Sequence, residues 1–304
     1  TTYDDDCDGD TNDEDPDGGV EYFVDLDGDG YGLSSDSRFY CEANGDYSAL
    51  DDEDCDDDDD TIYPDQLDTN DLGFEGISED CDPYIDEDSI EDALDSGAVL
   101  IFSEMQVNPH AVGNENKNEW FELVNVGDET VYLDNWTFEN CRGSELDICT
   151  DFVVSPDKAV SADPGDVLLF CFKSGNMDAI LGAGSCDYSY GIDTSLSTTY
   201  RDFNFRLRND TESALTITMG DTVIDSVHHK IGSPYTFPST GDAKEGYSLM
   251  FDSDYFSDLD SDELNDDGGN WCHTNDSAYI YETVFTTIPE DNYGSPGTLN
   301  PTCL

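Results

Sequence analysis

Residues 119–125 read Glu-Trp-Phe-Glu-Leu-Val-Asn, and residues 101–105 read Ile-Phe-Ser-Glu-Met. Both stretches mix apolar and polar side chains, as in Phe121-Glu122-Leu123, and from residue 98 onward apolar and polar residues tend to alternate between turns, which is the pattern of half-buried β-strands. Similar segments recur along the chain from residue 98 onward. The predicted strands cover residues 99–105, 119–125, 130–138, 167–173, 214–219, 222–227 and 247–251.

Seven short strands over about 200 residues predict a sandwich of two sheets with long inserted loops. Gly220 and Asp221 separate two of the strands, and this pair is typical of a two-residue hairpin that begins with glycine. We therefore expect a mainly β protein whose larger part is a β-sandwich.

Charge divides the chain into two parts. Its 304 residues carry 74 acidic and 10 basic side chains, which gives a net charge of −64. Nucleic acids and anionic membrane surfaces are polyanions, so we exclude them as partners. Residues 1–96 hold 38 of the acids and one base, Arg38. We predict an Asp-rich region over residues 1–96 and a β-sandwich over residues 97–304, two domains being usual for this length.

The Asp-rich region has almost no apolar periodicity, and Asp, Gly and Pro dominate its composition. Such a segment buries too little apolar surface to offset the entropy of ordering its chain. It is therefore either disordered or ordered by something that it binds. Bound cations are the simplest agent.

Two stretches have the ligand spacing of a calcium loop of EF-hand type, with oxygens at positions 1, 3, 5, 7 and 12 and glycine at position 6. The first predicted loop has Asp4, Asp6, Asp8, Asp10 and Asp15, and the second has Asp25, Asp27, Asp29, Tyr31 and Asp36. Position 7 would contribute its main-chain carbonyl. Aspartate replaces the usual glutamate at position 12, and this shorter side chain weakens the expected site.

Three further runs keep part of this spacing. The third candidate has Asp54, Asp56, Asp58 and Asp65, with Asp59 in place of the glycine. The fourth, Asp80, Asp82, Asp86 and Asp88, is irregular and contains Pro83. The fifth, Asp258, Asp260 and Asp262, continues with Glu263 instead of glycine and reaches Gly269 at position 12.

Carboxylate oxygens without clustered histidines or thiolates favour Ca²⁺ over Zn²⁺ or Cu²⁺, and they are more numerous than Mg²⁺ usually requires. We predict several bound Ca²⁺ ions. The alternative for any single run is an ordinary solvated acidic loop. Adaptation to high salt would also account for the acids beyond residue 96, and it is compatible with calcium loops.

The cysteines are even in number and are not grouped in the pairs typical of zinc or thiol redox sites. We expect disulfides, and therefore a secreted or cell-surface protein. The start at Thr1, without a methionine or an apolar leader, is what a mature chain would show after signal-peptide removal. No apolar run approaches the length that spans a membrane. The cysteines are Cys7, Cys41, Cys55, Cys81, Cys141, Cys149, Cys171, Cys186, Cys272 and Cys303.

The succession of Cys7, residues 22–32 (Tyr-Phe-Val-Asp-Leu-Asp-Gly-Asp-Gly-Tyr-Gly), residues 54–57 (Asp-Cys-Asp-Asp) and Cys81 resembles the aspartate-rich bacterial putative metal-binding motif repeat. That repeat is similar to thrombospondin type 3 calcium repeats. The resemblance covers residues 3–90, and residues 74–80 depart from it. It implies a compact, helix-poor stalk around Ca²⁺ that disulfides pin. Four cysteines allow three pairings, and we favour Cys41 with Cys55 because the short intervening loop closes easily.

Residues 101–105 and 119–125, residues 132–138 (Tyr-Leu-Asp-Asn-Trp-Thr-Phe) and residues 294–297 (Gly-Ser-Pro-Gly) resemble the lamin tail domain. The resemblance spans residues 98–302, with long insertions, and implies an immunoglobulin-like sandwich that serves as a binding or spacer module. Six cysteines in this part allow 15 pairings. We favour Cys141 with Cys149, Cys171 with Cys186, and Cys272 with Cys303.

No catalytic motif is present, and we predict that the protein is not an enzyme. Glu119 and Glu122 are three residues apart in a strand, so their carboxylates point to opposite faces and do not form an acid–base pair. They are expected to be polar positions beside core Phe121. His228 and His229 are neighbours in a strand and diverge in the same way.

The combined features predict an extracellular, calcium-rigidified structural protein. Self-association into a fibre or surface layer, with Ca²⁺ within or between subunits, is the expected extension. The alternative is a monomeric cell-surface adhesin or cation-binding module whose sandwich binds a carbohydrate or protein ligand.

Overall fold

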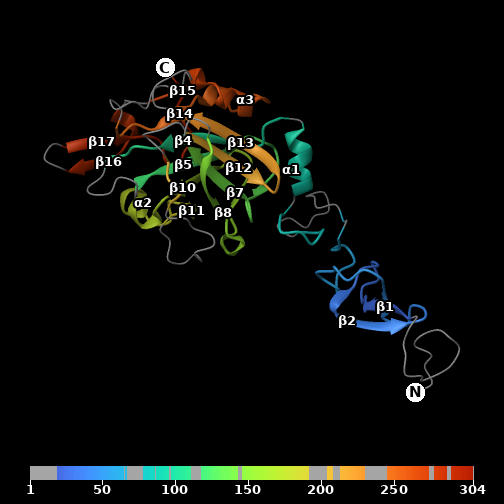
Figure 1. Cartoon of the computed structure of the whole chain (residues 1–304). Coiled ribbons are helices and arrows are strands. Elements are labelled where there is room, and N and C mark those ends of the chain that lie inside the picture. Colours follow the sequence, from blue (N-terminus) through green and yellow to red (C-terminus); the bar gives the residue numbers. More distant parts are fainter. Residues whose placement is uncertain are drawn as a thin grey trace. The chain divides into compact units, whose positions relative to one another are not determined.

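The computed structural model describes residues 19–64, 66, 78–85, 87–95, 97–110, 118–142, 146–191, 204–207, 213–229, 245–273, 277–285 and 289–303. The chain forms two compact units, Thr1–Asp88 and Ser89–Leu304 (Figure 1). The division lies within helix α1 (Glu87–Leu94), whereas the sequence placed the boundary between residues 96 and 97. Within the described helices, no segment is long and apolar enough to cross a membrane.

The first unit contains a small antiparallel sheet and irregular loops. Its strands are β1 (Val20–Val24), β2 (Leu33–Tyr40) and β3 (Tyr47–Ala49), in the order β2-β1-β3. Among the residues described here, Val24, Ala49 and Ile62 are its buried apolar side chains. The sequence did not predict this sheet, because β2 has too few apolar residues to show alternation.

One predicted disulfide of this unit is wrong. Cys55 bonds to Cys81, with 5.7 Å between their Cα atoms, so it does not pair with Cys41. Cys41 is itself disulfide-bonded. The short loop between Cys41 and Cys55 did not determine the pairing, because the fold brings Cys81 to Cys55 although they are 26 residues apart in the sequence.

The second unit is built on two sheets. The six-stranded sheet has the order β11-β10-β5-β4-β14-β15, and the four-stranded sheet has the order β13-β12-β7-β8. The larger sheet contains β4 (Leu100–Gln106), β5 (Trp120–Asn125), β10 (Val167–Cys171), β11 (Tyr188–Ser189), β14 (Leu249–Phe251) and β15 (Trp271–Cys272). The smaller contains β7 (Thr137–Arg142), β8 (Ile148–Val153), β12 (Ser213–Met219) and β13 (Thr222–His229).

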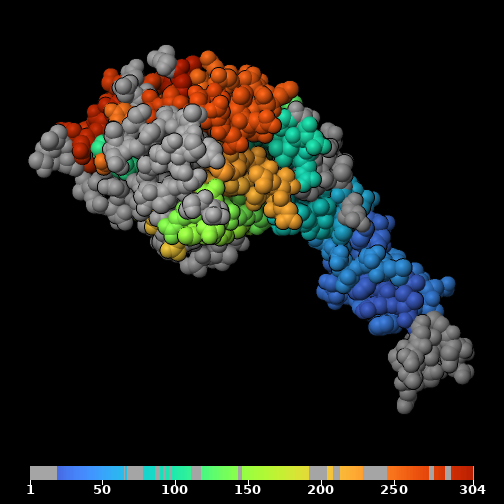
Figure 2. All heavy atoms as spheres, turned by 45° about the horizontal axis from the view of Figure 1, so that its top comes forward, coloured from blue at the N-terminus to red at the C-terminus, as the bar shows by residue number. Residues whose placement is uncertain are grey.

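Shorter elements complete this unit. The pairs β6 (Val131–Tyr132) with β9 (Ser161–Ala162) and β16 (Ile280–Phe285) with β17 (Pro289–Tyr293) form two small sheets. Helices α2 (Ser174–Leu181) and α3 (Ser261–Asn265) follow β10 and β14. In the space-filling view, the C-terminal segments, coloured orange to red, gather along one side of this unit (Figure 2).

Aromatic side chains form the core between the two sheets. Phe138 of β7 lies 6.3 Å from Phe102 and 5.4 Å from Phe121, ring centre to ring centre, and both partners belong to the larger sheet. Phe138 also stacks on Phe152 at 4.9 Å and contacts Phe170 at 4.9 Å. All five rings are buried. Face-to-face packing of two sheets through such side chains defines a β-sandwich.

The predicted mainly β fold is confirmed, and each of the seven predicted strands coincides with an observed strand. One of them, over residues 130–138, divides into β6 and β7 because the chain turns at Asn135, which has a positive φ of 62°. The Gly220 hairpin is confirmed, with a φ of 55° at the glycine. The disulfides Cys141–Cys149, Cys171–Cys186 and Cys272–Cys303 are present as predicted.

The carboxylates of Glu119, just before β5, and of Glu122, within it, bind different segments and do not converge. Glu119 accepts a hydrogen bond from the amide of Leu207 at 3.2 Å, and Glu122 accepts one from the amide of Gly297. Both side chains are buried, at 2% and 0% exposed. They are therefore not surface positions of an alternating strand, and each carboxylate instead holds a distant segment of the chain.

Candidate metal centre

The loop after β1 turns sharply around two glycines, and each aspartate in it binds a nearby amide. Gly28 and Gly30 have φ values of +90° and +106°, which other residues rarely adopt. The Oδ1 atoms of Asp25, Asp27 and Asp29 accept hydrogen bonds from the amides of Gly28, Asp29 and Tyr31, at 2.7, 3.3 and 2.8 Å. One oxygen of each carboxylate is thereby committed to the loop. The second oxygen of Asp25 accepts a hydrogen bond from the hydroxyl of Ser48 at 3.0 Å, whereas the second oxygens of Asp27 and Asp29 have no hydrogen-bond partner.

A second loop contributes Asp54 and Asp57 to the same place. Asp54 Oδ1 accepts a hydrogen bond from the amide of Asp56 at 2.9 Å. Asp57 Oδ1 accepts one from the amide of Leu26 at 2.7 Å, which joins the two loops directly. The amide of Asp54 also binds the carbonyl of Gly32 at 3.3 Å. The two loops are therefore fixed side by side.

Five aspartates form two overlapping groups, whose members have carboxylate oxygens within 4.8 Å of one another. Asp25, Asp27 and Asp29 form one group, and Asp27, Asp54 and Asp57 form the other. The Oδ2 atoms of Asp27, Asp29, Asp54 and Asp57 are buried and have no hydrogen-bond partner. Asp54 and Asp57 are only 8% and 6% exposed, so bulk water does not solvate these oxygens well. Buried acceptors without donors are costly unless a cation or proton satisfies them.

The pKa values of the clustered aspartates reflect their burial and their closeness to one another. Burial raises the pKa of Asp27, Asp29 and Asp54 above the ordinary value of 3.8, and neighbouring aspartates raise it further. Hydrogen bonds from loop amides oppose both effects. A bound cation would remove the repulsion among these carboxylates. The donor set consists of oxygen, which suits a hard cation.

The structure brings some of the predicted ligands together and leaves others apart. Asp25, Asp27, Asp29 and Asp54 meet in the cluster, and the ring of Tyr31 stacks on Tyr63 at 5.5 Å beside it. Asp36 lies instead on β2, where it is exposed and accepts a hydrogen bond from the hydroxyl of Tyr47 at 3.0 Å.

The remaining candidates have different environments. Asp56 and Asp58 are exposed. Asp80 accepts a hydrogen bond from the amide of Asp82 at 3.0 Å, and Asp82 accepts one from Tyr84 at 2.6 Å, so this loop has the same local turns. Neither aspartate belongs to the close groups in the described part of the chain. Asp4, Asp6, Asp8, Asp10, Asp15, Asp65 and Asp86 lie outside the described residues.

The fifth candidate run lies around the start of α3. Asp258 and Asp260 are exposed, and Asp262 is in the first turn of the helix. None of the close groups found among the described residues includes them. A helical start at residue 261 prevents the loop that the D-x-D-x-D spacing requires.

Asp57 is the ligand candidate that sequence reasoning missed. It is three residues after Asp54 and therefore falls outside the alternate spacing of a calcium loop. The available signal was the run of acids at residues 56–60, but nothing in that run distinguishes Asp57. Its role depends on the contact with Leu26, which is 31 residues away.

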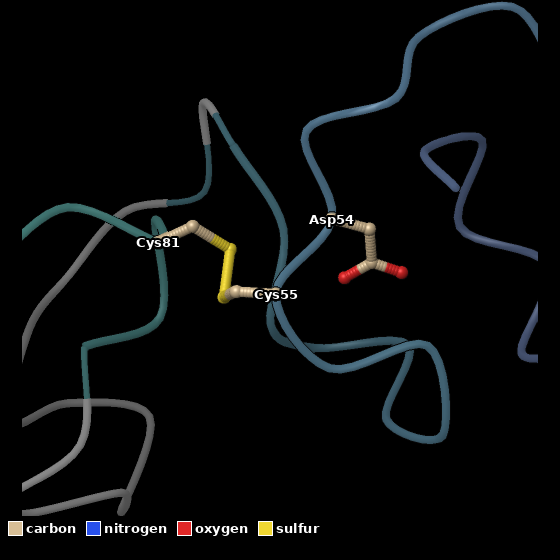
Figure 3. A group of neighbouring side chains, drawn as sticks. All are labelled: Asp54, Cys55 and Cys81. Atoms are coloured by element: carbon tan, nitrogen blue, oxygen red, sulfur yellow. A yellow bond between two sulfur atoms is a disulfide. The ribbon is translucent and has the colours of Figure 1, made fainter. Parts of the chain in front are cut away.

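Two other groups of close ligand atoms contain disulfide sulfurs. Asp54 lies beside Cys55 and Cys81, whose sulfurs are bonded to each other (Figure 3). Glu139 lies beside Cys141 and Cys149, which are likewise bonded. A disulfide offers no thiolate to a metal, so neither group is a metal site in the oxidised protein.

Comparison with known proteins gives little further information. No family model matches the chain, and no curated protein sequence matches it. Among solved structures, the chain is similar to a DUF4876 family protein from Bacteroides thetaiotaomicron, with 11% identity and a TM-score of 0.36. The match covers 51% of this chain and 63% of that protein.

Proposed function

We propose that the protein is an extracellular, calcium-binding structural protein whose first unit is made rigid by Ca²⁺. The observation that carries the proposal is the cluster of Asp25, Asp27, Asp29, Asp54 and Asp57, with four buried carboxylate oxygens that lack hydrogen-bond donors. The disulfides support an oxidising, extracellular location.

Calcium is the cation that this donor set fits best. Ca²⁺ accepts six to eight oxygen ligands in flexible geometry, whereas Mg²⁺ requires a near-ideal octahedron and keeps several waters. Five carboxylates from two loops provide many oxygens and a large negative charge. Zn²⁺ would favour histidine or thiolate ligands, and the close groups in the described residues offer neither.

Cation binding would couple directly to the order of the first unit. Its apolar core is small, and the two loops carry like charges that repel each other. A cation held by Asp27, Asp54 and Asp57 would connect the loop after β1 with the loop around residue 54. Binding free energy then becomes folding free energy.

Self-association into a fibre or surface layer extends this proposal, since a stalk stiffened by Ca²⁺ and disulfides suits a load-bearing extracellular assembly. Electron microscopy and small-angle scattering with excess Ca²⁺, and then with a chelator, test the extension. Fibres that loosen on chelation would support it. A monodisperse monomer in saturating Ca²⁺ would favour the adhesin alternative, in which the sandwich binds a carbohydrate or protein.

Calorimetric titration of the full chain with Ca²⁺ tests the binding site itself. Asp54→Asn removes one charge at the centre of the cluster and should weaken at least one Ca²⁺-binding step about tenfold, since ligand charge tunes the affinity of such sites. Asp52→Asn is the matched control, because Asp52 is exposed nearby and should leave the titration unchanged. Equal Ca²⁺ binding by the two variants would contradict the proposed site.

A further inference from the structure

Two glutamates lie opposite each other in the centre of the larger sheet of the sandwich. Glu104 of β4 and Glu122 of β5 are register partners, and both side chains are 0% exposed. A bulge between Phe102 and Glu104 shifts the register by one residue. Because of this shift, Glu104 faces the same side of the sheet as Glu122.

The pair binds the chain segment that runs from Gly294 to Cys303, here called the C-terminal strap. Glu104 accepts hydrogen bonds from the amide of Ser295 at 3.1 Å to each oxygen and from its hydroxyl at 2.6 Å. It also accepts one from the hydroxyl of Ser248. Glu122 Oε1 accepts one from the amide of Gly297, and Glu122 Oε2 is buried without a hydrogen-bond partner.

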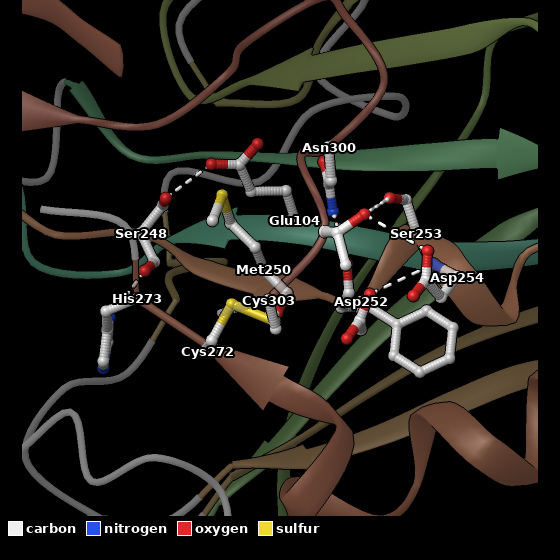
Figure 4. Close-up of a disulfide and its surroundings, with 12 residues drawn as sticks. Glu104, Ser248, Met250, Asp252, Ser253, Asp254, Cys272, His273, Asn300 and Cys303 are labelled. Carbon is white, nitrogen blue, oxygen red and sulfur yellow. Dashed lines mark hydrogen bonds between the residues drawn. A yellow bond between two sulfur atoms is a disulfide. The ribbon is translucent and has the colours of Figure 1, made fainter. Parts of the chain in front are cut away.

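Other contacts fix the rest of the strap. Asn300 donates hydrogen bonds to the carbonyls of Ser103 at 2.7 Å and Phe251 at 3.1 Å. A Cβ atom on Gly294 would lie 2.8 Å from Glu104 Oε1, so any larger residue there would displace this carboxylate. The disulfide Cys272–Cys303 attaches the end of the strap, and it lies next to Met250 (Figure 4).

Among the described residues, the surroundings of the pair provide hydrogen-bond donors but no permanent positive charge. Three ionisable groups face it from neighbouring elements: Asp187, which repels Glu122, the hydroxyl of Tyr281 on β16, and His273, whose Nδ1 lies 2.6 Å from the carbonyl of Ser248. Within the described residues, neither lysine nor arginine influences either carboxyl group. Two buried anions that repel each other in this way cannot both remain unneutralised.

A proton suits this pair better than a metal ion as the neutralising group. The groups that reach the pair are the amides of Ser295 and Gly297 and the hydroxyls of Ser248 and Ser295, whereas a cation would need further carboxylate or carbonyl oxygens around it. A proton on Glu122 would remove the second negative charge. In the aspartate cluster of the first unit, by contrast, carboxylate oxygens lie close to other carboxylate oxygens, and four of them have no hydrogen-bond donor.

We propose that Glu104 and Glu122 form a proton-binding site, a carboxylic acid beside a carboxylate, that latches the C-terminal strap onto the sandwich. Loss of the shared proton leaves two adjacent buried anions, and their repulsion opens the latch. The disulfide Cys272–Cys303 keeps the open strap attached. The inference is independent of the calcium site, because it concerns only residues of the second unit.

The direction of the pH dependence follows from the buried environment. Burial raises the pKa of Glu104 from 4.5 to about 7, and burial together with Glu104 raises the pKa of Glu122 well above 4.5. A group whose pKa is raised by folding stabilises the fold fully below its unfolded pKa, and this contribution disappears as the pH rises through the folded pKa. The latch is therefore closed in acid and opens at alkaline pH.

Hydrogen exchange of the Ser295 and Gly297 amides in the full, calcium-saturated chain tests the latch. We expect their protection factors to fall as the pH rises between about pH 6 and pH 9, by up to about tenfold per pH unit for each proton lost. Glu122→Gln replaces the protonated acid by a neutral amide and should keep the protection constant over this range. Glu263→Gln, at an exposed position on α3, should behave like the unchanged protein.

Further measurements distinguish a proton in the pair from a metal ion and from general unfolding. Infrared spectra should show protonated carboxyl absorption near neutral pH that Glu122→Gln reduces, while the part that comes from Asp225 remains. Asp225 is also buried, with its pKa raised to about 8, so local exchange rather than global melting is the primary measurement. Unchanged pH dependence in Glu122→Gln would overturn the latch. Protection that depends on Ca²⁺ instead of pH would show that a metal ion, and not a proton, occupies the pair.

Discussion

Buried carboxylates occur in both units of the molecule, and their neighbours give them opposite roles. In the first unit, Asp54 and Asp57 present oxygens to other carboxylate oxygens, with no donor between them. In the second unit, Glu104 and Asp225 are surrounded by donors, including Ser295 for the former and Asn265 for the latter. An acid among oxygens is suited to a cation, whereas an acid among N–H and O–H groups is suited to a structural hydrogen-bond network.

The two units also differ in what stabilises them. The sandwich buries many large apolar side chains, whose transfer from water contributes about 1.5–3 kcal/mol each. The described part of the first unit buries only Val24, Ala49 and Ile62, together with one described disulfide. We therefore expect the sandwich to be stable by itself and the first unit to depend on a bound ligand.

The largest effect should follow from calcium removal. With a chelator, the first unit should lose most of its amide protection, because the carboxylate repulsion is no longer balanced and its apolar core is small. Hydrogen exchange measured by mass spectrometry should show this loss in peptides from residues 19–64, with no change in the strands of the sandwich. If the amides of residues 19–64 stay protected after chelation, the disulfides and the small sheet are sufficient to keep the first unit folded without Ca²⁺.

A core substitution should give the reverse result. Phe138→Ala removes a ring that contacts Phe102, Phe121, Phe152 and Phe170, and should destabilise the sandwich by about 3–5 kcal/mol. Denaturant unfolding followed by tryptophan fluorescence measures the loss, since Trp120 and Trp136 are buried in this unit. Calcium titration of the variant should keep the affinity of the unchanged protein. A matching loss of Ca²⁺ affinity would contradict the independence of the two units.

A smaller effect is expected at Gly32. A Cβ atom there would lie 2.5 Å from the carbonyl oxygen of Val24 and 2.8 Å from Cβ of Phe23, so Gly32→Ala forces the strands apart. We expect a loss of about 1–3 kcal/mol, seen as weaker Ca²⁺ binding and faster exchange in β1. Gly175→Ala is the control, because no atom lies within 4 Å of its added Cβ and alanine favours the helix α2. If Gly32→Ala and Gly175→Ala show the same Ca²⁺ affinity and the same exchange in β1, the first unit accommodates the added methyl group at residue 32.

Sequence patterns predicted the sandwich well because its core-facing residues repeat with the period of a strand. They failed for β2, where Ser and Asp occupy half of the positions and hydrogen bonds, rather than burial, maintain the strand. The spacing of Asp25, Asp27 and Asp29 located one half of the aspartate cluster, since a single loop contains these three residues. The positions of Asp57 and of the Glu104–Glu122 pair result from contacts between segments that are distant in the sequence. The spacing of neighbouring residues therefore could not predict them.

The smallest effect should occur at Asp36, where the EF-hand pattern and the structure differ. In the pattern Asp36 is the ligand at position 12, so its substitution would weaken Ca²⁺ binding strongly. In the structure its carboxylate binds the hydroxyl of Tyr47 on the exposed sheet, while Asp57 approaches the cluster through Leu26. Asp36→Asn should therefore change the Ca²⁺ affinity by less than about twofold, and Asp57→Asn should reduce it by about tenfold or more. Calorimetric titrations of the two variants under the same conditions measure both affinities. A larger loss of Ca²⁺ affinity in Asp36→Asn than in Asp57→Asn would show that Asp36, and not Asp57, is a ligand.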